Sequence, residues 1–312
     1  MNRRVLIYLS DDVVEGLAAI DFAHQLALQR PTDILFISPE PLRAIFEPFC
    51  HLCFGSNTEF KILNFNYSST FAVRVKQALS HLFYFQSWDL VLVAGADVSS
   101  SWSLPIFSPA DRVFFIRSGD GYFKALAELQ LRYWCEARPM DLEALGVQIQ
   151  SEIAPEKTIK SRIMLDLSEP APADASFWAE FIFCLIGKGA LLEGKTVLVF
   201  AGEGETDMLN ALASNLPLGQ IEIAGDGGVL SRLQIVSQID IWVGSNPLNG
   251  YLAHCLNKKV IFPFDDGPPW QDLYPERSPR RDGIYVPRAN LNELSQLIAT
   301  IFLSRTNARE TY

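Results

Sequence analysis

Short apolar runs alternate with longer segments of helical periodicity along most of this chain. The runs have the length of buried strands, and some contain no polar residue, as in VLIYL at 5–9 and VLVFA at 197–201. A run without polar alternation indicates a strand that is covered on both faces. We therefore expect strands at 5–9, 33–37, 60–63, 89–94, 112–116, 162–167, 196–201, 220–224, 239–243 and 260–264.

The segments between these runs place apolar residues three or four positions apart, which is the spacing of an amphipathic helix. We expect helices at 13–28, 42–46, 71–85, 175–186, 206–216, 230–237, 247–256 and 291–303. Strands that alternate with helices form parallel sheets, because parallel neighbours need a crossover connection. The rhythm restarts after a polar, proline-containing stretch at 154–160, so the sequence predicts two successive doubly wound α/β domains.

The length of the chain agrees with this division, since 312 residues suit two domains of about 150 residues each. We assign 1–153 to an N-terminal Rossmann-like domain, 154–160 to a linker and 161–290 to a C-terminal Rossmann-like domain. A last helix follows within 291–312. Hydrophobic residues make up 49% of the chain, which is typical of a packed globular protein and excludes a largely disordered one.

Charge and apolar content restrict the partners. A net charge of −10 disfavours a general nucleic-acid surface and a broad dock on anionic lipid, so we expect no nucleic acid and at most peripheral membrane association. The first apolar run is too short for a signal-peptide core, and the most apolar later stretch, 177–186, is about half a membrane span. We therefore expect a cytoplasmic protein with reduced cysteines. Cys50 and Cys53 have metal-like spacing, but two packed thiols are the favoured interpretation.

Candidate chemistry lies in the loops that follow strands, because ligands of open parallel sheets bind beyond the carboxyl ends of the strands. This rule selects 10–12, 95–97, 202–205 and 244–247. Asp12 lies between a buried strand and a helix, where a carboxylate could act as a general base. The alternative is that Asp12 caps the helix that follows, which is a common role for Asp.

Two glycine-containing segments in the second half are candidates for nucleotide binding. The segment 202–205 (GEGE) carries carboxylates that would repel a diphosphate, so we expect a ribose or adenosine contact there, with an ordinary tight turn as the alternative. The segment 244–247 (GSNP) has no acid and opens a helix, whose N-terminus attracts phosphate. Asn246 is equally suited to cap that helix, with proline at the first helical position.

The order of these segments resembles that of glycosyltransferase family 9, the ADP-heptose:lipopolysaccharide heptosyltransferase group, over most of the chain. The matching pieces are the strand and loop at 5–14, the WDLV strand at 88–91, the helix opening at 177–180, the strand and loop at 197–205, the Ala-Gly pair at 224–225 and the segment 239–253. The resemblance implies a GT-B fold, in which two Rossmann-like domains face a central cleft. It also implies that the last helix packs back on the N-terminal domain.

The sequence departs from the family pattern at the donor site. Asn246 stands where the family has Asp, Leu248 where it has Gly, and Tyr251 where it has His. The four residues directly before Phe177 and Trp178, 173–176 (ADAS), include no basic residue, although the family has a cation there that contacts the donor phosphate. Losing a cation beside a diphosphate leaving group costs on the order of a few kcal/mol at the transition state.

A later loop at 276–281 offers a replacement for this cation. It carries Arg280 and Arg281 in the half of the chain that should bind the donor, so either guanidinium could reach a phosphate. The alternative is an ordinary solvated loop.

We therefore predict an inverting, metal-independent glycosyltransferase with a nucleotide-sugar co-substrate and no other cofactor. The resemblance implies that Asp12 takes the proton from the acceptor hydroxyl. The residues expected to contact the donor are Gly202, Glu205, Gly244, Ser245, Asn246, Asn249, Arg280 and Arg281. The alternatives are a non-catalytic GT-B-like binding or scaffold protein with a degenerate donor site, and a nucleotide-sugar epimerase. The sequence leaves the base, the sugar and the glycan, lipid or protein acceptor open.

Overall fold

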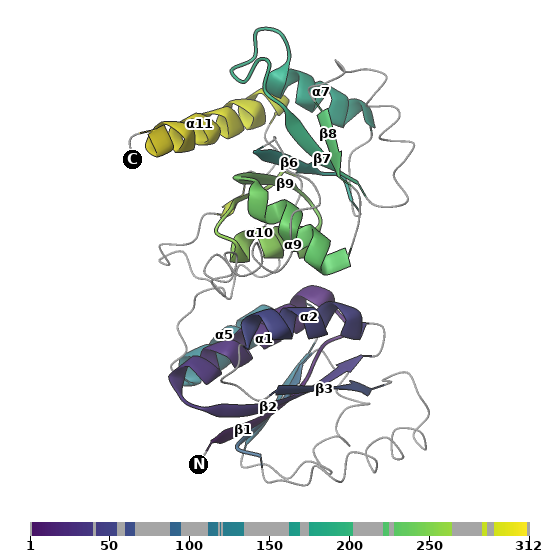
Figure 1. Ribbon diagram of the computed structural model, residues 1–312, viewed down its shortest axis with the longest axis vertical. Coiled ribbons are helices and arrows are strands. Elements are labelled where there is room, and N and C mark those ends of the chain that lie inside the picture. The colour runs from purple at the N-terminus through teal and green to yellow at the C-terminus, as the bar shows by residue number, and fades with distance from the viewer. Residues whose placement is uncertain are drawn as a thin grey trace. The chain divides into compact units, whose positions relative to one another are not determined.

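The computed structural model describes residues 2–39, 42–54, 60–65, 88–94, 112–117, 119, 121–133, 162–168, 175–201, 221–224, 228–263, 283–285 and 290–310. The chain divides into two compact units, Met1–Met140 with Trp270–Ser278 and Asp141–Pro269 with Pro279–Tyr312. Each unit contains one parallel sheet and its own helices (Figure 1). The predicted linker at 154–160 lies outside the described residues.

The N-terminal unit contains a five-stranded parallel sheet in the order β3-β2-β1-β4-β5. Its strands are β1 Arg3–Tyr8, β2 Thr32–Pro39, β3 Phe60–Phe65, β4 Leu90–Ala94 and β5 Val113–Ile116. Its helices are α1 Val13–Gln29, α2 Arg43–Cys53 and α5 Tyr122–Arg132, and α1 contacts both of the others. The apolar run of β1 is buried because β2 and β4 flank it, as a central strand requires.

The C-terminal unit contains a six-stranded parallel sheet in the order β11-β10-β9-β6-β7-β8. Its strands are β6 Ile163–Asp166, β7 Val197–Phe200, β8 Ile221–Ala224, β9 Ile241–Gly244, β10 Lys259–Phe262 and β11 Gly283–Tyr285. Its helices are α7 Ala175–Ile186, α9 Gly228–Gln238, α10 Pro247–Cys255 and α11 Leu291–Glu310. The predicted α/β class with two Rossmann-like sheets is confirmed.

Both sheets reverse their strand order at one point. In each unit the second and third strands lie on one side of the first strand. The fourth strand then pairs with the opposite edge of that first strand. The reversal lies between β1 and β4 in the N-terminal unit and between β6 and β9 in the C-terminal unit. Loops diverge at such a point, which leaves room for a ligand beyond the carboxyl ends of the strands.

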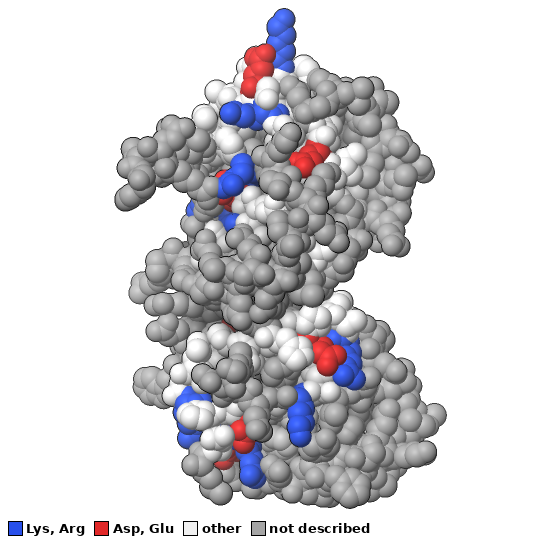
Figure 2. Space-filling model, viewed as in Figure 1, with Lys and Arg blue, Asp and Glu red and all other residues white. Residues whose placement is uncertain are grey.

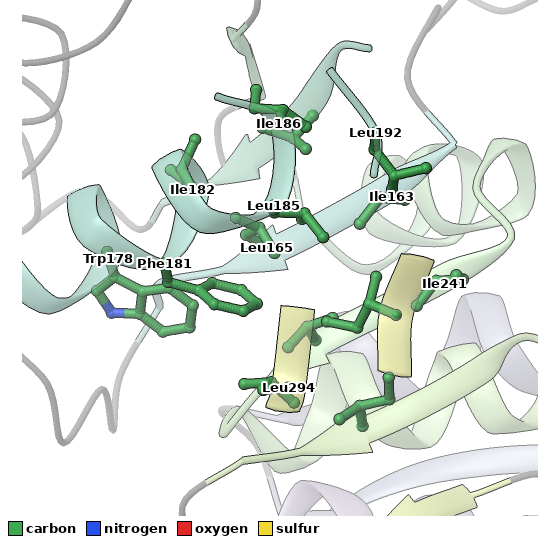
Figure 3. Close-up of a cluster of buried hydrophobic side chains, with 14 of the residues drawn as sticks. Ile163, Leu165, Trp178, Phe181, Ile182, Leu185, Ile186, Leu192, Ile241 and Leu294 are labelled. Carbon is green, nitrogen blue, oxygen red and sulfur yellow. The ribbon is translucent and has the colours of Figure 1, made fainter. Parts of the chain in front are cut away.

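The core of the C-terminal unit joins α7 to the sheet and to the last helix (Figure 3). Trp178, Phe181 and Ile182 of α7 are fully buried, and Leu294 and Ile298 of α11 belong to the same cluster. The first half of α11 therefore packs within the C-terminal unit, whereas we expected this helix to pack back on the N-terminal domain. A contact of its last turns with that domain stays a prediction.

Several elements differ from those expected. The helix expected at 42–46 extends over Arg43–Cys53 and includes Pro48. The last helix runs to Glu310 and not to 303, and neither α5 nor β11 was predicted. The helices expected at 71–85 and 206–216 lie outside the described residues.

Among the described residues, no helix is long and apolar enough to cross a membrane. Cys50 and Cys53 are buried thiols on α2, and no cluster of three or more potential metal ligands occurs within the described ranges. On the face drawn in Figure 2, the described acidic and basic side chains are interspersed on each unit.

Candidate functional site

The loop after β1 holds Asp12 at the strand-order reversal of the N-terminal unit. Asp12 is exposed, and its Oδ1 accepts the backbone N–H of Glu15 at 3.0 Å, so it is the N-cap of α1. The capping interpretation of Asp12 is therefore confirmed. Oδ2 of Asp12 accepts no hydrogen bond from any residue that the structure describes. Because a carboxylate has about four lone-pair sites, a cap on one oxygen leaves the other available to a ligand.

A buried carboxylate, Glu15, holds this loop in place. The hydroxyl of Ser10 donates to Glu15 Oε2 at 2.6 Å, and the backbone N–H of Gly119 donates to Glu15 Oε1 at 2.8 Å. Ser10 Oγ in turn accepts the backbone N–H of Asp12 at 3.0 Å. Gly119 has a φ of 86°, a left-handed conformation that favours glycine. Glu15 therefore ties the loop that carries Asp12 to the segment that precedes α5.

Tyr122 adds a second connection between α1 and α5. Its hydroxyl donates to the backbone oxygen of Glu15 at 2.9 Å, and the whole side chain is buried. Burial raises the pKa of the Tyr122 phenol well above its usual range, and the carboxylates of Glu15 and Asp12 raise it further. The phenol therefore stays protonated and acts as a donor.

The strand-order reversal of the C-terminal unit brings Asp166 and Gly244 together. They end β6 and β9 and are direct partners in the parallel register. A Cβ atom at Gly244 would lie 2.7 Å from Asp166 Cβ and 2.9 Å from the Asp166 backbone oxygen. Only glycine fits without displacing the neighbouring strand, so Gly244 lets the two strands end side by side.

Asp166 is a completely buried carboxylate with several hydrogen-bond donors around it. Its Oδ2 accepts the indole N–H of Trp242 at 3.0 Å and Nδ2–H of Asn249 at 2.8 Å. Its Oδ1 accepts the backbone N–H of Ser168 at 3.0 Å and the Ser168 hydroxyl. Burial raises the pKa of Asp166 from 3.8 to about 6, although these hydrogen bonds favour the charged form and oppose the rise.

The segment that follows β9 forms the N-terminus of α10. Asn246 is the N-cap of this helix, and its Oδ1 accepts the backbone N–H of Asn249 at 3.0 Å, with Pro247 at the start of the helix. Ser245 is buried, and Asn249 is buried with its side chain bonded to Asp166. The predicted contact of the Asn249 side chain with a donor therefore meets a structural obstacle, because that amide is already engaged inside the protein.

Arg232 of α9 lies beside this helix terminus. Its Nη1 donates to Asn249 Oδ1 at 3.4 Å, and its guanidinium carbon lies 5.7 Å from the ring centroid of Phe200, the last residue of β7. The side chain is half-buried. A positive charge is thus present beside the first turn of α10.

Tyr251 and Gly250 fill the interior behind the same helix. Tyr251 is fully buried, so it is not available to a ligand at the surface of the sheet edge. A Cβ atom at Gly250 would lie 2.7 Å from the Phe262 ring and 3.1 Å from the Trp242 ring, so glycine is required for α10 to approach the sheet.

The structure brings some of the predicted site residues together. Gly244, Ser245, Asn246 and Asn249 meet at one helix terminus, while Asp12 lies at the corresponding edge of the other unit. Gly202, Glu205, Arg280 and Arg281 lie outside the described residues.

Sequence reasoning missed Glu15, Asp166 and Arg232. Two of them carry a local signal. Asp12-x-x-Glu15 has the spacing of a capping box, and Asp166 is a carboxylate inside an otherwise apolar strand, where it must be buried and bonded. Arg232 carries none, because its partners are distant in the sequence.

Similarity to solved structures extends over nearly the whole chain. E. coli heptosyltransferase WaaC with ADP has a TM-score of 0.63 at 13% identity, covering 97% of this chain and 99% of that chain. E. coli ADP-heptose LPS heptosyltransferase II has a TM-score of 0.61 at 13% identity, covering 97% and 99%. A glycosyl transferase family 9 protein from Veillonella parvula DSM 2008 has a TM-score of 0.61 at 11% identity, covering 96% and 91%.

No protein-family model and no curated protein matches the chain by sequence. At these identities the structural similarity establishes the fold. The chain has two Rossmann-like domains of the GT-B type, and its predicted resemblance to family 9 is confirmed at the level of structure.

Proposed function

We propose that this protein is a glycosyltransferase that moves a sugar from a nucleotide-sugar donor to an acceptor hydroxyl. The observation that carries the proposal is a polar site at the strand-order reversal of each unit, in a fold similar to that of heptosyltransferases over almost the entire chain. One of those proteins was solved with ADP, which supports a nucleotide-linked donor for this chain.

In the proposed reaction, Asp12 is the general base. One carboxylate oxygen caps α1 and fixes the side chain, and the other accepts the proton of the acceptor hydroxyl. The hydroxyl oxygen then forms a bond to the anomeric carbon from the face opposite the leaving group. The bond from that carbon to the diphosphate oxygen breaks, and the nucleoside diphosphate leaves with the electron pair. A single displacement of this kind inverts the anomeric carbon and requires neither a metal ion nor a covalent intermediate.

The donor would bind at the C-terminal reversal, against the segment from Gly244 to Asn246. Small residues there let a phosphate approach the backbone, and the N-terminus of α10 carries a partial positive charge. Gly202 and Glu205 would contact the nucleoside, and Arg280 and Arg281 would face the phosphates. These four contacts are part of the proposal and rest on the sequence.

A second candidate is a GT-B-like binding or scaffold protein with a degenerate donor site. Two observations favour it. Asn246 uses its side chain as a helix cap, and Tyr251 is fully buried where the family has a histidine. Both positions therefore lack the ligand-directed groups that the family resemblance would supply.

Two aspartates side by side allow a matched test of the enzyme proposal. Asp12→Asn keeps a good N-cap but cannot accept the proton, so we expect transfer to fall by about 100- to 10,000-fold while donor affinity stays unchanged. Asp11→Asn changes an exposed neighbouring carboxylate and should leave transfer near the wild-type rate. The assay is acceptor-dependent release of nucleoside diphosphate, after a thermal-shift screen of ADP-, UDP-, GDP- and TDP-sugars has identified the donor.

The same assay separates the rival functions. Equal transfer by wild type and Asp12→Asn would refute Asp12 as the base. Binding without transfer by the wild type would favour the scaffold function, and an isomerised nucleotide sugar formed without acceptor would identify an epimerase.

A further inference from the structure

Arg232 occupies a position at which two elements of the C-terminal unit meet. Its guanidinium lies over the ring of Phe200, so it is located at the carboxyl end of β7, at the edge where ligands of such sheets bind. The same guanidinium donates to Asn249, which lies in the first turn of α10. The positive charge of Arg232 and the positive end of the helix dipole are therefore close together.

The Asn249 amide is oriented by the buried carboxylate. Its Nδ2 donates to Asp166 Oδ2 at 2.8 Å, so its Oδ1 is the atom that accepts from Arg232. A flipped amide would point its N–H group at the guanidinium and its oxygen at the carboxylate, and both contacts would be repulsive. Asp166 itself is held by Trp242 and Ser168. The buried carboxylate of Asp166 therefore orients the Arg232 side chain through the Asn249 amide.

We propose that Arg232 contacts the diphosphate of the donor, and that Asn249 and Asp166 are positioning residues that aim it. This inference rests on the proposed glycosyltransferase function. Arg is suited to the role because its planar guanidinium can bind two phosphate oxygens at once, and because it keeps its charge at all physiological pH values. The leaving diphosphate gains negative charge during transfer, so a fixed cation here favours the transition state.

Arg232 would also supply the cation that the sequence lacks before Trp178. The family places a cation before the tryptophan of α7, and this chain has none there. In this proposal α9 supplies the cation instead, and Asn249, which is bonded to Asp166, supports it.

The test compares two ligands in two arginine variants. The ligands are the nucleoside diphosphate that binds the wild type best, among ADP, UDP, GDP and TDP, and the matching nucleoside monophosphate. Arg232→Gln should weaken the diphosphate by about 10- to 100-fold and change the monophosphate much less. The control is Arg132→Gln, which removes the same charge and a similar arginine–phenylalanine contact. Arg132 is the last residue of α5, and its guanidinium carbon lies 5.9 Å from the ring centroid of Phe114 in β5. The control should leave both affinities unchanged.

The positioning role is tested by a double-mutant cycle. Asn249→Ser should weaken the diphosphate in the wild-type background but add little when Arg232 is already Gln, because Asn249 acts through that arginine. Additive effects in the cycle would overturn the positioning role, and Arg232→Gln alone still tests the contact if Asn249→Ser does not fold.

The outcomes distinguish this inference from the proposed function. If the wild type binds a nucleoside diphosphate and Arg232→Gln binds it equally well, the inference is wrong while the function stands. If the wild type binds none of the four nucleotides, the function and the inference that rests on it are both overturned.

Discussion

Asp166 should give the protein a pH dependence opposite to that of most carboxylates. Burial raises its pKa from 3.8 to about 6 in the folded protein, whereas the unfolded chain keeps the ordinary value. Between these two pH values the folded state binds a proton that the unfolded state has lost. Stability therefore falls as pH rises through this window, and the contribution is greatest below the lower value.

The size of this effect follows from the same two values. A pKa raised from 3.8 to about 6 corresponds to about 3 kcal/mol of unfolding free energy between the protonated and charged limits. About 2 kcal/mol of this should be lost between about pH 4.5 and about pH 7. Other carboxylates titrate in the same range, so the effect must be isolated by comparison with a variant.

Asp166→Asn is the appropriate comparison because it keeps the shape and removes the charge. Its amide N–H group would face donors that now bind a carboxylate, so the variant should be less stable at low pH by about 1–3 kcal/mol. As pH rises, the wild type should lose about 2 kcal/mol more than the variant, and the gap between them should narrow.

The assay is urea unfolding at about pH 4.5 and about pH 7. Tryptophan fluorescence monitors it, since Trp178 and Trp242 are fully buried in this unit. Amide hydrogen exchange in β6 gives the local opening free energy of the same sheet. Parallel pH profiles for wild type and Asp166→Asn would refute the reasoning, because they would mean that folding does not raise the pKa of Asp166.

Other contacts give predictions of smaller scope. Ser168→Ala removes one donor to Asp166, which should raise the pKa of Asp166 further. The loss of unfolding free energy with rising pH, measured by the same urea unfolding, should therefore be larger than in the wild type, and an unchanged profile would contradict the contact. Gly244→Ala should destabilise the C-terminal unit by about 1–3 kcal/mol, because its Cβ would lie 2.7 Å from Asp166 Cβ; wild-type stability would argue against the tight strand pairing. Tyr122→Phe should cost about 1 kcal/mol by thermal unfolding, through the lost hydrogen bond to Glu15. Asn246→Ala should cost about 1 kcal/mol while Asn246→Asp keeps the cap, and equal stabilities of the two would contradict it.

The sheets were predictable because a buried parallel strand is a short run of apolar residues, which a few consecutive positions of the sequence reveal. The run RIMLDL at 162–167 contains β6 and the run IDIWV at 239–243 covers most of β9. Helices alternate with the strands as expected, although α5 itself was not predicted. The strand β11, Gly283–Tyr285, is too short to produce such a signal. The division into two domains followed from the repeat of the pattern and needed no long-range information.

The site was predictable only in part, because its function depends on contacts between distant segments. The role of Asn246 as a helix cap could be inferred from a short stretch of sequence. The bond between Asp166 and Asn249 joins residues 83 positions apart, and the bond between Gly119 and Glu15 joins residues 104 positions apart. Nothing local encodes such pairs, so sequence reasoning selected loops that follow strands and missed the groups that hold those loops in place.

We propose above all that the C-terminal strand-order reversal binds a nucleotide-linked donor. Hydrogen exchange with and without the best-binding nucleoside diphosphate measures this directly. With the nucleotide bound, we expect slower exchange of backbone amides from Gly244 through the first turn of α10 and in α9 around Arg232. Tight binding that leaves those amides unchanged and protects other segments would contradict it.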